Sequence, residues 1–407
     1  MSDSKRVLVT VHGPDRPGIC HAICRVLAEH SVPVIDIEQS STHRLLSLSF
    51  VIDLGGFGGQ EADAILVKAL LYEGWRLGAQ VHLERMREDD FIAFPELSES
   101  INRNLCAITM IGNQVGADAL AAVSEVLARR SANITNIHKL SRSRLAAVEI
   151  IASVPGTEEA MAEVKREILA AAKDLDIDIA IQRENLYRRS KRLVVFDMDS
   201  TLIEQEVIDE VARAVGCHAE VAAVTERAMR GEIEFRDAFA QRVALFRGAR
   251  LDDILAKVAP TLTLKPGAAA LIDVLKKLGY KLAVISGGFG AFVDPIKEQL
   301  GLDYAFSNTL DVEGGVLTGR VAGEVIDRQG KAELLSMVAR REGIQLDQVM
   351  AVGDGANDLA MLERAGLGVA FNAKKNVQAK AQVAVNNTNM ASLLYLLGIR
   401  DDELPEL

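Results

Sequence analysis

Two aspartates follow an uninterrupted apolar run, and of all the side chains in the sequence they are the best placed to do chemistry. The run is Leu193–Phe196, and the aspartates are Asp197 and Asp199. Such a run predicts a strand buried on both faces of a parallel sheet, whose carboxyl end is where open α/β folds place their reactive groups. Two carboxylates this close repel each other unless a cation lies between them. We therefore expect a metal-assisted site with one carboxylate as nucleophile and the other as acid or base, although an Asp-rich turn is the simpler alternative.

Three later stretches also carry polar residues at strand ends or at a helix start. Val284–Gly288 ends in a serine and two glycines, whose N–H groups can approach an anionic oxygen closely. Lys331 opens a helical pattern, and Val352–Asp358 runs from an apolar strand into further carboxylates. Because parallel strands end at one edge of a sheet, we expect these residues to converge on Asp197. Carboxylates without soft ligands favour a hard cation, and Mg²⁺ is the expected one.

Other catalytic chemistries lack the residues that they need in this half of the chain. The last histidine is His218, and Cys217 is the one cysteine after residue 186, without an arginine six residues beyond it. A phosphohistidine, a Ser-His-Asp triad and a phosphate-binding Cys-x₅-Arg loop are therefore disfavoured, and no glycine-rich Walker sequence is present. Ser286 lacks the preceding glycine of a nucleophile elbow. An aspartate at a strand end is the remaining nucleophile.

From Leu193 onward, strand patterns alternate with helical patterns. Helical stretches at about 205–262 separate the first strand from the next strong one, at Lys281–Ser286. Alternating β and α elements predict a doubly wound, Rossmann-like parallel sheet, here with a helical cap after its first strand. The fold class is therefore α/β.

The first 185 residues contain an internal repeat. Arg25–Ile37 aligns with Glu125–Ile137 at a constant offset, and each copy has the pattern βαββαβ of a ferredoxin-like domain. The basic stretch Arg183–Arg192 is expected to be a solvated linker. We therefore predict three domains, at 1–90, 91–185 and 186–407, called below the first repeat, the second repeat and the C-terminal domain.

Composition and charge exclude several classes of function. The formal net charge of −11 argues against non-specific binding of nucleic acid. No run of uncharged apolar residues is long enough to cross a membrane, and the first residues do not resemble an export signal. The four cysteines are too few for a disulfide framework. A cytoplasmic protein is expected.

The first repeat resembles the ACT family of small regulatory domains. The resemblance rests on the loop Gly13–Ile19 and the helix behind it, where Pro17 is preset for a helix start and free N–H groups favour a carboxylate. It implies an amino-acid effector, and L-serine is the effector that we expect. The second repeat replaces this loop with Gly112–Asp118, which leaves ligand binding there open. Both repeats could instead serve packing or dimerisation, and exposed strand edges lead us to expect a homodimer.

The C-terminal domain resembles the haloacid dehalogenase superfamily of aspartyl-phosphate phosphotransferases. The order of motifs, from Asp-x-Asp through Ser-Gly and Lys to Gly-Asp-Gly-x-Asn-Asp, is very specific. Within that superfamily, Asp197–Thr201, Glu204–Glu206 and Gly287–Phe289 resemble the phosphoserine phosphatases. The resemblance implies Mg²⁺-dependent hydrolysis of O-phospho-L-serine to L-serine and phosphate, the last step of serine biosynthesis.

The resemblance also assigns roles to single residues. Asp197 would attack phosphorus, and Asp199 would move protons as acid and then base. The residues that would bind substrate are Glu206, Arg242, Ser286, Gly287, Lys331 and Asn357. Those that would hold Mg²⁺ are Asp197, Asp199, through its backbone carbonyl, and Asp354, with Asp358 in support.

Two other functions compete with this one. The same site could serve a phosphomutase or a phosphatase for another small ester, against which Glu206 and Arg242 argue, because they would pair with the ammonium and carboxylate of serine. The chain could also be an amino-acid sensor whose C-terminal domain only transmits a signal. The intact set of acid, base and phosphate ligands argues against a sensor.

Overall fold

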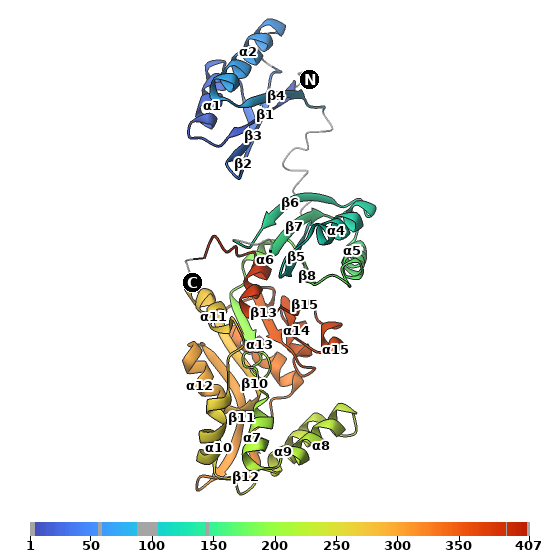
Figure 1. Cartoon of the computed structure of the whole chain (residues 1–407), viewed down its shortest axis with the longest axis vertical. Coiled ribbons are helices and arrows are strands. Elements are labelled where there is room, and N and C mark those ends of the chain that lie inside the picture. The colour runs from blue at the N-terminus through green and yellow to red at the C-terminus, as the bar shows by residue number, and fades with distance from the viewer. Residues whose placement is uncertain (1–4, 56–58, 88–104, 143–145, 388, 405–407) are drawn as a thin grey trace. The chain divides into compact units, whose positions relative to one another are not determined.

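The fold is taken from a computed structural model, which describes residues 5–55, 59–87, 105–142, 146–387 and 389–404. The chain divides into two compact units, Met1–Glu99 and Ser100–Leu407, and each is described by itself (Figure 1). The predicted boundary near residue 90 lies outside the described residues.

The first unit contains the first repeat, a four-stranded antiparallel sheet with two helices. Its elements are β1 (Arg6–Pro14), α1 (Ile19–Glu29), β2 (Val34–Thr42), β3 (Leu45–Asp53), α2 (Gln60–Leu77) and β4 (Gln80–Arg85), and the strand order is β2-β3-β1-β4. Along β1 buried residues alternate with more exposed ones, so one face of the strand packs on the helices. All nine residues of the edge strand β2 are exposed.

The second repeat has the same topology. Its elements are β5 (Leu105–Gly112), α4 (Ala117–Arg129), β6 (Asn133–Lys139), β7 (Ala147–Ser153), α5 (Glu158–Ala171) and β8 (Ile177–Arg183), in the strand order β6-β7-β5-β8. Both repeats are therefore βαββαβ, as the sequence predicts.

Within the second unit, the second repeat packs on the C-terminal domain. Six consecutive residues of β5 are buried, which means that both faces of this strand are covered. Ile111 and Ala180 belong to the same hydrophobic core as strand and helix residues of the C-terminal domain. Asp178 accepts hydrogen bonds from the backbone N–H (2.8 Å) and the side-chain amide (3.0 Å) of Asn386 across the seam. The short helix α6 (Leu186–Arg189) then leads into the C-terminal domain.

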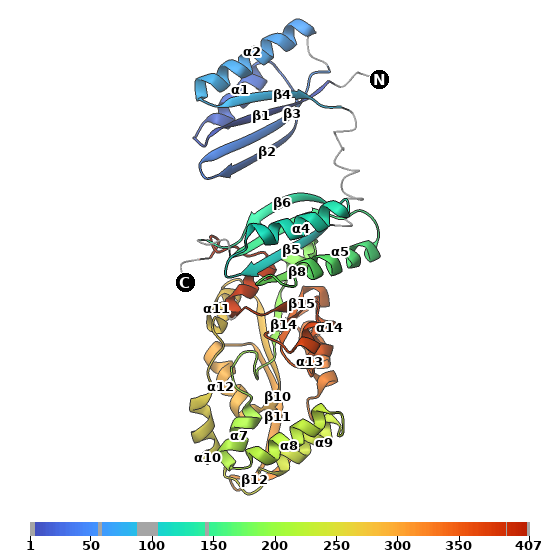
Figure 2. The same cartoon turned by 45° about the vertical axis from the view of Figure 1, so that its right-hand side comes forward.

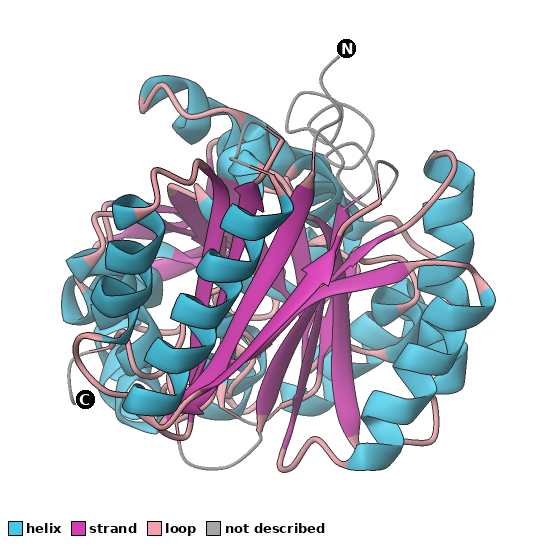
Figure 3. Cartoon of the chain, turned by 90° about the horizontal axis from the view of Figure 1, so that it is seen from above, coloured by secondary structure: helices cyan, strands magenta, loops and turns pink. Residues whose placement is uncertain are grey.

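The C-terminal domain is built on a seven-stranded sheet in the order β12-β11-β10-β9-β13-β14-β15. The strands are β9 (Leu193–Phe196), β10 (Lys281–Phe289), β11 (Tyr304–Glu313), β12 (Val316–Ala322), β13 (Val349–Gly353), β14 (Leu367–Phe371) and β15 (Val383–Val385). All neighbours pair in parallel except β11 and β12. Separate hydrophobic cores include alternate residues of β9 together with helix residues, so helices cover both faces of the sheet. This confirms the predicted doubly wound α/β fold. Figure 3 distinguishes the helices of the chain from its strands by colour.

The helices of this domain follow the predicted order. They are α7 (Val207–Val215), α8 (His218–Met229), α9 (Phe235–Ala244), α10 (Leu251–Val258), η2 (Ala259–Thr261), α11 (Ala268–Lys277), α12 (Gly290–Leu300), α13 (Arg328–Arg341), η3 (Leu346–Gln348), α14 (Leu359–Arg364), α15 (Lys375–Gln378) and η4 (Met390–Leu397). The helix expected at 390–397 is a 3₁₀ helix.

Helices α7–α10 form a cap inserted after the first strand, at the end of the C-terminal domain remote from the second repeat (Figure 2). Rings of the cap pack on the sheet domain: the centroids of Phe239 and Phe289 lie 5.9 Å apart, and the Phe246 ring meets Phe289 edge-on. No described helix is both long and apolar enough to cross a membrane.

Candidate active site

The ends of three adjacent parallel strands bring the predicted residues together. In the sheet register, Phe196 of β9 lies beside Val284 of β10 and Val352 of β13. Asp197 is one residue beyond this row, while Ser286 and Asp354 are two residues beyond it on their own strands. The convergence of these side chains therefore follows from the parallel register.

Lys331 connects two of the carboxylates. Its ammonium group donates to Oδ1 of Asp197 (2.5 Å) and to Oδ1 of Asp358 (2.7 Å), and all three side chains are buried. Burial alone would lower the pKa of Lys331, but the two carboxylates raise it above its ordinary value. Lys331 therefore stays charged. No described residue donates a hydrogen bond to Oδ2 of Asp197, which leaves that oxygen available to react.

Asp358 is fixed on both of its oxygens. Besides the lysine on Oδ1, Oδ2 accepts the backbone N–H of Gly355 (2.9 Å). A Cβ on Gly353 would lie 2.6 Å from Cγ of Asp358, so only glycine allows this close approach.

Asp199 lies in a second hydrogen-bond chain. Ser286 donates to its Oδ2 (3.3 Å) and itself accepts the N–H of Gly288 (2.8 Å), while the N–H of Val207, at the start of cap helix α7, donates to Oδ1 (3.1 Å). Burial, together with the nearby negative charge of Glu206, raises the pKa of Asp199 to about 7. A carboxyl with such a pKa can both release and accept a proton near neutrality.

The arrangement of carboxylates fits a divalent cation. Carboxylate oxygens of Asp197, Asp354 and Asp358 lie within 4.8 Å of one another. Burial and the neighbouring Asp358 raise the pKa of Asp354 to about 6, and burial and Asp358 also raise the pKa of Asp197. Lys331 neutralises only part of this negative charge, and an oxygen-seeking cation would neutralise the rest.

Two buried residues that sequence reasoning missed support these groups. Thr201, which is fully buried, donates to Oδ1 of Asp354 (3.0 Å) and so orients this carboxylate. Asn308, at 2% exposure, donates to the carbonyl of Gly287 (2.8 Å) and accepts the N–H of Ile326 (2.8 Å). It thereby joins the glycine turn after β10 to the loop that leads to Lys331. A polar residue in the middle of a strand pattern is the signal that could have identified Asn308.

Glu206 and Arg242 come from the cap and lie near each other. Glu206 is exposed and accepts a hydrogen bond from Ser200 (2.8 Å). The Arg242 guanidinium lies 5.9 Å from the Phe239 ring centroid and donates from Nε to the backbone carbonyl of Ala238 (3.4 Å), without an ion pair to any described residue. Burial lowers the pKa of Arg242, while the charges of Asp209 and Glu206 oppose this shift. Such a guanidinium would be stabilised by an incoming carboxylate.

The predicted site residues lie at or after the ends of the strands, at the start of α13, where Lys331 stands, and in the cap. Ser286, Lys331 and the aspartates are joined by hydrogen bonds, as described above. Asn357 is half-buried and lies close to Gly355. If Gly355 carried a Cβ, this atom would lie only 2.1 Å from Oδ1 of Asn357.

Models of known families match the three parts of the chain. Residues 191–366 match haloacid dehalogenase-like hydrolases, and residues 5–84 and 106–182 each match an ACT domain. These matches agree with both predicted resemblances.

The chain is also similar to characterised proteins over nearly its whole length. It is 42% identical to a phosphoserine phosphatase of Streptomyces coelicolor, covering 99% of this chain and 94% of that one. A phosphoserine phosphatase of Mycobacterium tuberculosis is 35% identical, over 98% and 94%. The crystal structure of a probable phosphoserine phosphatase from Vibrio cholerae, 36% identical, covers 77% of this chain and 91% of its own, with a TM-score of 0.59. The chain therefore belongs to the phosphoserine phosphatases, a family of haloacid dehalogenase-like hydrolases, and carries two ACT domains.

Proposed function

We propose that this protein hydrolyses O-phospho-L-serine to L-serine and phosphate, as the last step of serine biosynthesis, through an aspartyl-phosphate on Asp197. The observation that carries the proposal is the pair formed by the buried Asp197, bonded to Lys331, and the half-buried Asp199, bonded to Ser286. The relatives named above as phosphoserine phosphatases support the substrate.

In the first step, the free Oδ2 of Asp197 attacks phosphorus while the bond from phosphorus to the serine oxygen breaks. Asp199, with its pKa near 7, gives its proton to the leaving oxygen. Lys331, the Ser286 hydroxyl and the N–H of Gly287 bind the phosphoryl oxygens, whose negative charge they stabilise.

In the second step, Asp199 takes a proton from a water molecule that attacks the aspartyl-phosphate. The bond between phosphorus and Oδ2 then breaks, and phosphate leaves with Asp197 restored. Asn357 orients the substrate or this water. One pair of carboxylates thereby performs both halves of the reaction.

Asp197, the backbone carbonyl of Asp199 and Asp354 would hold Mg²⁺. Asp358 supports the site without being a direct ligand, because both of its oxygens already accept hydrogen bonds. When bound, Mg²⁺ neutralises charge that would otherwise repel the anionic phosphate.

The substrate class is tested by measuring phosphate release from phosphoserine, phosphothreonine and sugar phosphates with Mg²⁺ present. We expect phosphoserine to give the largest kcat/KM, because Glu206 and Arg242 match its ammonium and carboxylate. Equal turnover of sugar phosphates would favour a general phosphatase, and transfer of phosphate between positions of a sugar without release would favour a mutase.

Replacing Arg242 by alanine tests the carboxylate contact. Loss of this contact is expected to lower kcat/KM for phosphoserine by about tenfold or more, while an aryl phosphate, which has no carboxylate, keeps its rate. Arg236→Ala is the matched control, because Arg236 lies on the same helix but pairs with Asp327. An equal loss on both substrates would remove Arg242 from substrate recognition.

We further propose that the domains are 1–90, 91–185 and 186–407, and that L-serine binds the first repeat and regulates a cytoplasmic homodimer. The exposed edge strand β2 supports pairing between chains. Regulation requires that serine bind two states of the assembly with different affinity. Serine titration of activity should therefore differ between the full chain and residues 100–407; identical curves would contradict regulation through the first repeat.

A further inference from the structure

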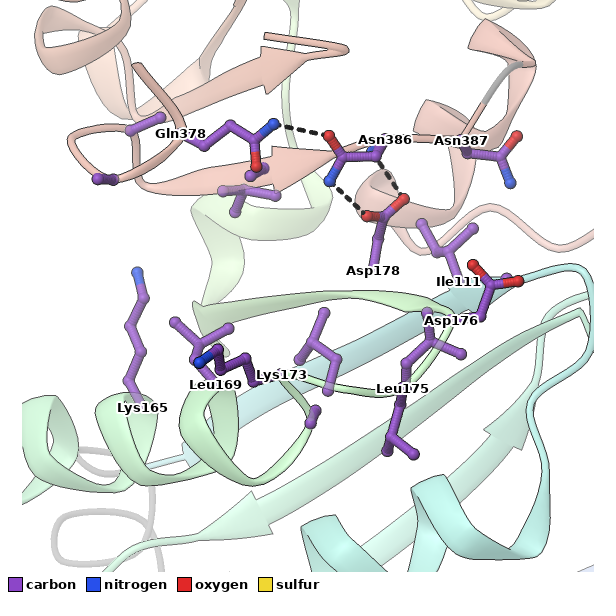
Figure 4. A pocket seen from close by; sticks show the side chains of 18 of the residues that line it. Ile111, Lys165, Leu169, Lys173, Leu175, Asp176, Asp178, Gln378, Asn386 and Asn387 are labelled. Atoms are coloured by element: carbon purple, nitrogen blue, oxygen red, sulfur yellow. Dashed lines mark hydrogen bonds between the residues drawn. The ribbon is translucent and has the colours of Figure 1, made fainter. Parts of the chain in front are cut away.

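The seam between the second repeat and the C-terminal domain contains two adjoining cavities. The larger, of about 690 Å³, lies between α5, β8 and the segment around β15, where the contact of Asp178 with Asn386 closes one side (Figure 4). The smaller, of about 510 Å³, shares Lys165, Gln382 and Val383 with it and extends to α6 and the loop before β13.

The two cavities differ in charge. The larger one is lined by aspartates as well as lysines. The charged residues that line the smaller one are Lys165, Arg183, Arg188, Lys191 and a single acid, Asp347. The smaller cavity is therefore basic, although the whole protein is acidic.

Carboxylates compensate the arginines of the smaller cavity but not its lysines. Arg188 pairs with Glu149 and Glu184, and Arg183 pairs with Glu158. Among the described residues, neither Lys165 nor Lys191 forms an ion pair; their ammonium groups donate to the backbone carbonyls of Gln382 (2.8 Å) and Asp347.

Lys191 in particular is costly where it stands, since it is buried, whereas Lys165 is half-buried. Lys191 is 6% exposed, and desolvation lowers its pKa to about 8 against the opposing charge of Asp347; burial lowers the pKa of Lys165 as well. In addition, the buried Nε of Arg188 has no hydrogen-bond acceptor among the described residues. A buried charge without a counter-charge is destabilising, and so is a buried donor without an acceptor. An anion bound in this cavity would supply the counter-charge and the acceptor that its lining lacks.

We propose that this cavity, which we call the seam site, binds the phosphate group of a small molecule or free phosphate itself, with Lys165, Lys191 and the Arg188 Nε as its donors. Ammonium and guanidinium groups give strong charge-assisted hydrogen bonds to a tetrahedral oxyanion. The cavity is larger than phosphate alone, so an organic group can accompany it. A bound anion would join α5 of the second repeat to α6 and to Lys191, just before β9, and so stiffen the seam. The seam site is separate from the strand ends that carry Asp197, and the proposal does not depend on the reaction.

A residue-resolved test is acetylation of lysines in the full-length protein, read by mass spectrometry. Inorganic phosphate is titrated against sodium chloride of equal ionic strength, and Lys277, exposed on α11, is the internal control. Phosphate should slow acetylation of Lys165 and Lys191 with one common midpoint, by about tenfold for each unit by which it raises their pKa, and leave Lys277 unchanged. If phosphate leaves the acetylation rates of Lys165 and Lys191 unchanged, the proposal is wrong and the cavity holds only water.

A second probe, propylphosphonate, distinguishes the two sources of the anion. If it protects both lysines at lower concentration than phosphate does, the ligand carries an organic group; if phosphate is the tighter probe, the ligand is the free ion. If neither probe slows acetylation of the two lysines, the proposal of a seam site is wrong.

Variants supply an independent readout in thermal unfolding. Lys165→Met and Lys191→Met should be at least as stable as wild type in chloride, because each removes an uncompensated charge. Each should also lose part of the rise in unfolding temperature that phosphate produces, whereas Lys277→Met keeps all of it. Phosphate bound at the active site contributes equally to every variant. The same phosphate-dependent rise in all of them would contradict the seam site.

Discussion

Replacing Asp197 by asparagine is expected to lower phosphoserine hydrolysis by a factor of about 10⁴ or more. The amide is a poor nucleophile, and no other described carboxylate has a free oxygen in contact with Lys331, because both oxygens of Asp358 accept hydrogen bonds. Acid quenching during turnover should trap phosphorylated wild-type protein, with the label on the peptide that contains Asp197. The variant should yield no label.

The matched control is Asp358→Asn, which also removes a carboxylate from Lys331 but leaves the proposed nucleophile in place. We expect it to lose activity through poorer positioning and still to form the labelled intermediate. Asp197→Asn should remain folded, because it removes one of several mutually repelling carboxylates. Full phosphatase activity in folded Asp197→Asn would overturn the proposed mechanism.

The strand ends could be predicted because each depends on a short, local pattern. An apolar run followed by a carboxylate or serine places that residue at the edge of a parallel sheet, and the register then brings the ends together. Asn308 could not be assigned this way. It lies in the middle of β11 and contacts Gly287, 21 residues earlier, so its role depends on how two neighbouring strands lie side by side. Contacts of this kind are tertiary, so the local sequence pattern does not predict them.

The repeats illustrate the same limit for whole domains. Their shared βαββαβ pattern could be predicted, but the packing of the second repeat on the C-terminal domain could not. A signal was present in the first strand of each: β1 alternates, as Val7-Leu8-Val9-Thr10-Val11, whereas β5 is apolar without alternation from Leu105 to Ile108. Unbroken apolar strands are buried on both faces. The unbroken apolar pattern of β5 agrees with the packing of the second repeat on the C-terminal domain. It does not reveal which surface covers the second face of the strand.

Removal of divalent cations is expected to abolish activity and to lower the thermal stability of the C-terminal domain. Asp197 is buried, Asp199 and Asp354 are half-buried beside it, and desolvation raises the pKa of all three carboxyl groups. A cation among them relieves this repulsion only in the folded protein, so Mg²⁺ should stabilise that state. At about 100 times its Kd, Mg²⁺ should raise the unfolding temperature by about 5 °C or more above the value in EDTA, and restore turnover in parallel.

Two aspartate variants separate the metal site from a general effect of ionic strength. Asp354→Asn removes a proposed ligand and should lose most of the Mg²⁺-dependent rise in unfolding temperature. Asp311→Asn is the control, because Asp311 lies on β11 and interacts with Thr318 and Arg320 instead; it should respond to Mg²⁺ like wild type. The folded state of Asp354→Asn also carries less repulsion, so its stability in EDTA should equal or exceed that of wild type. If EDTA changes neither the activity nor the unfolding temperature of the wild-type protein, Lys331 alone compensates the carboxylates, and the proposal of a metal site is wrong.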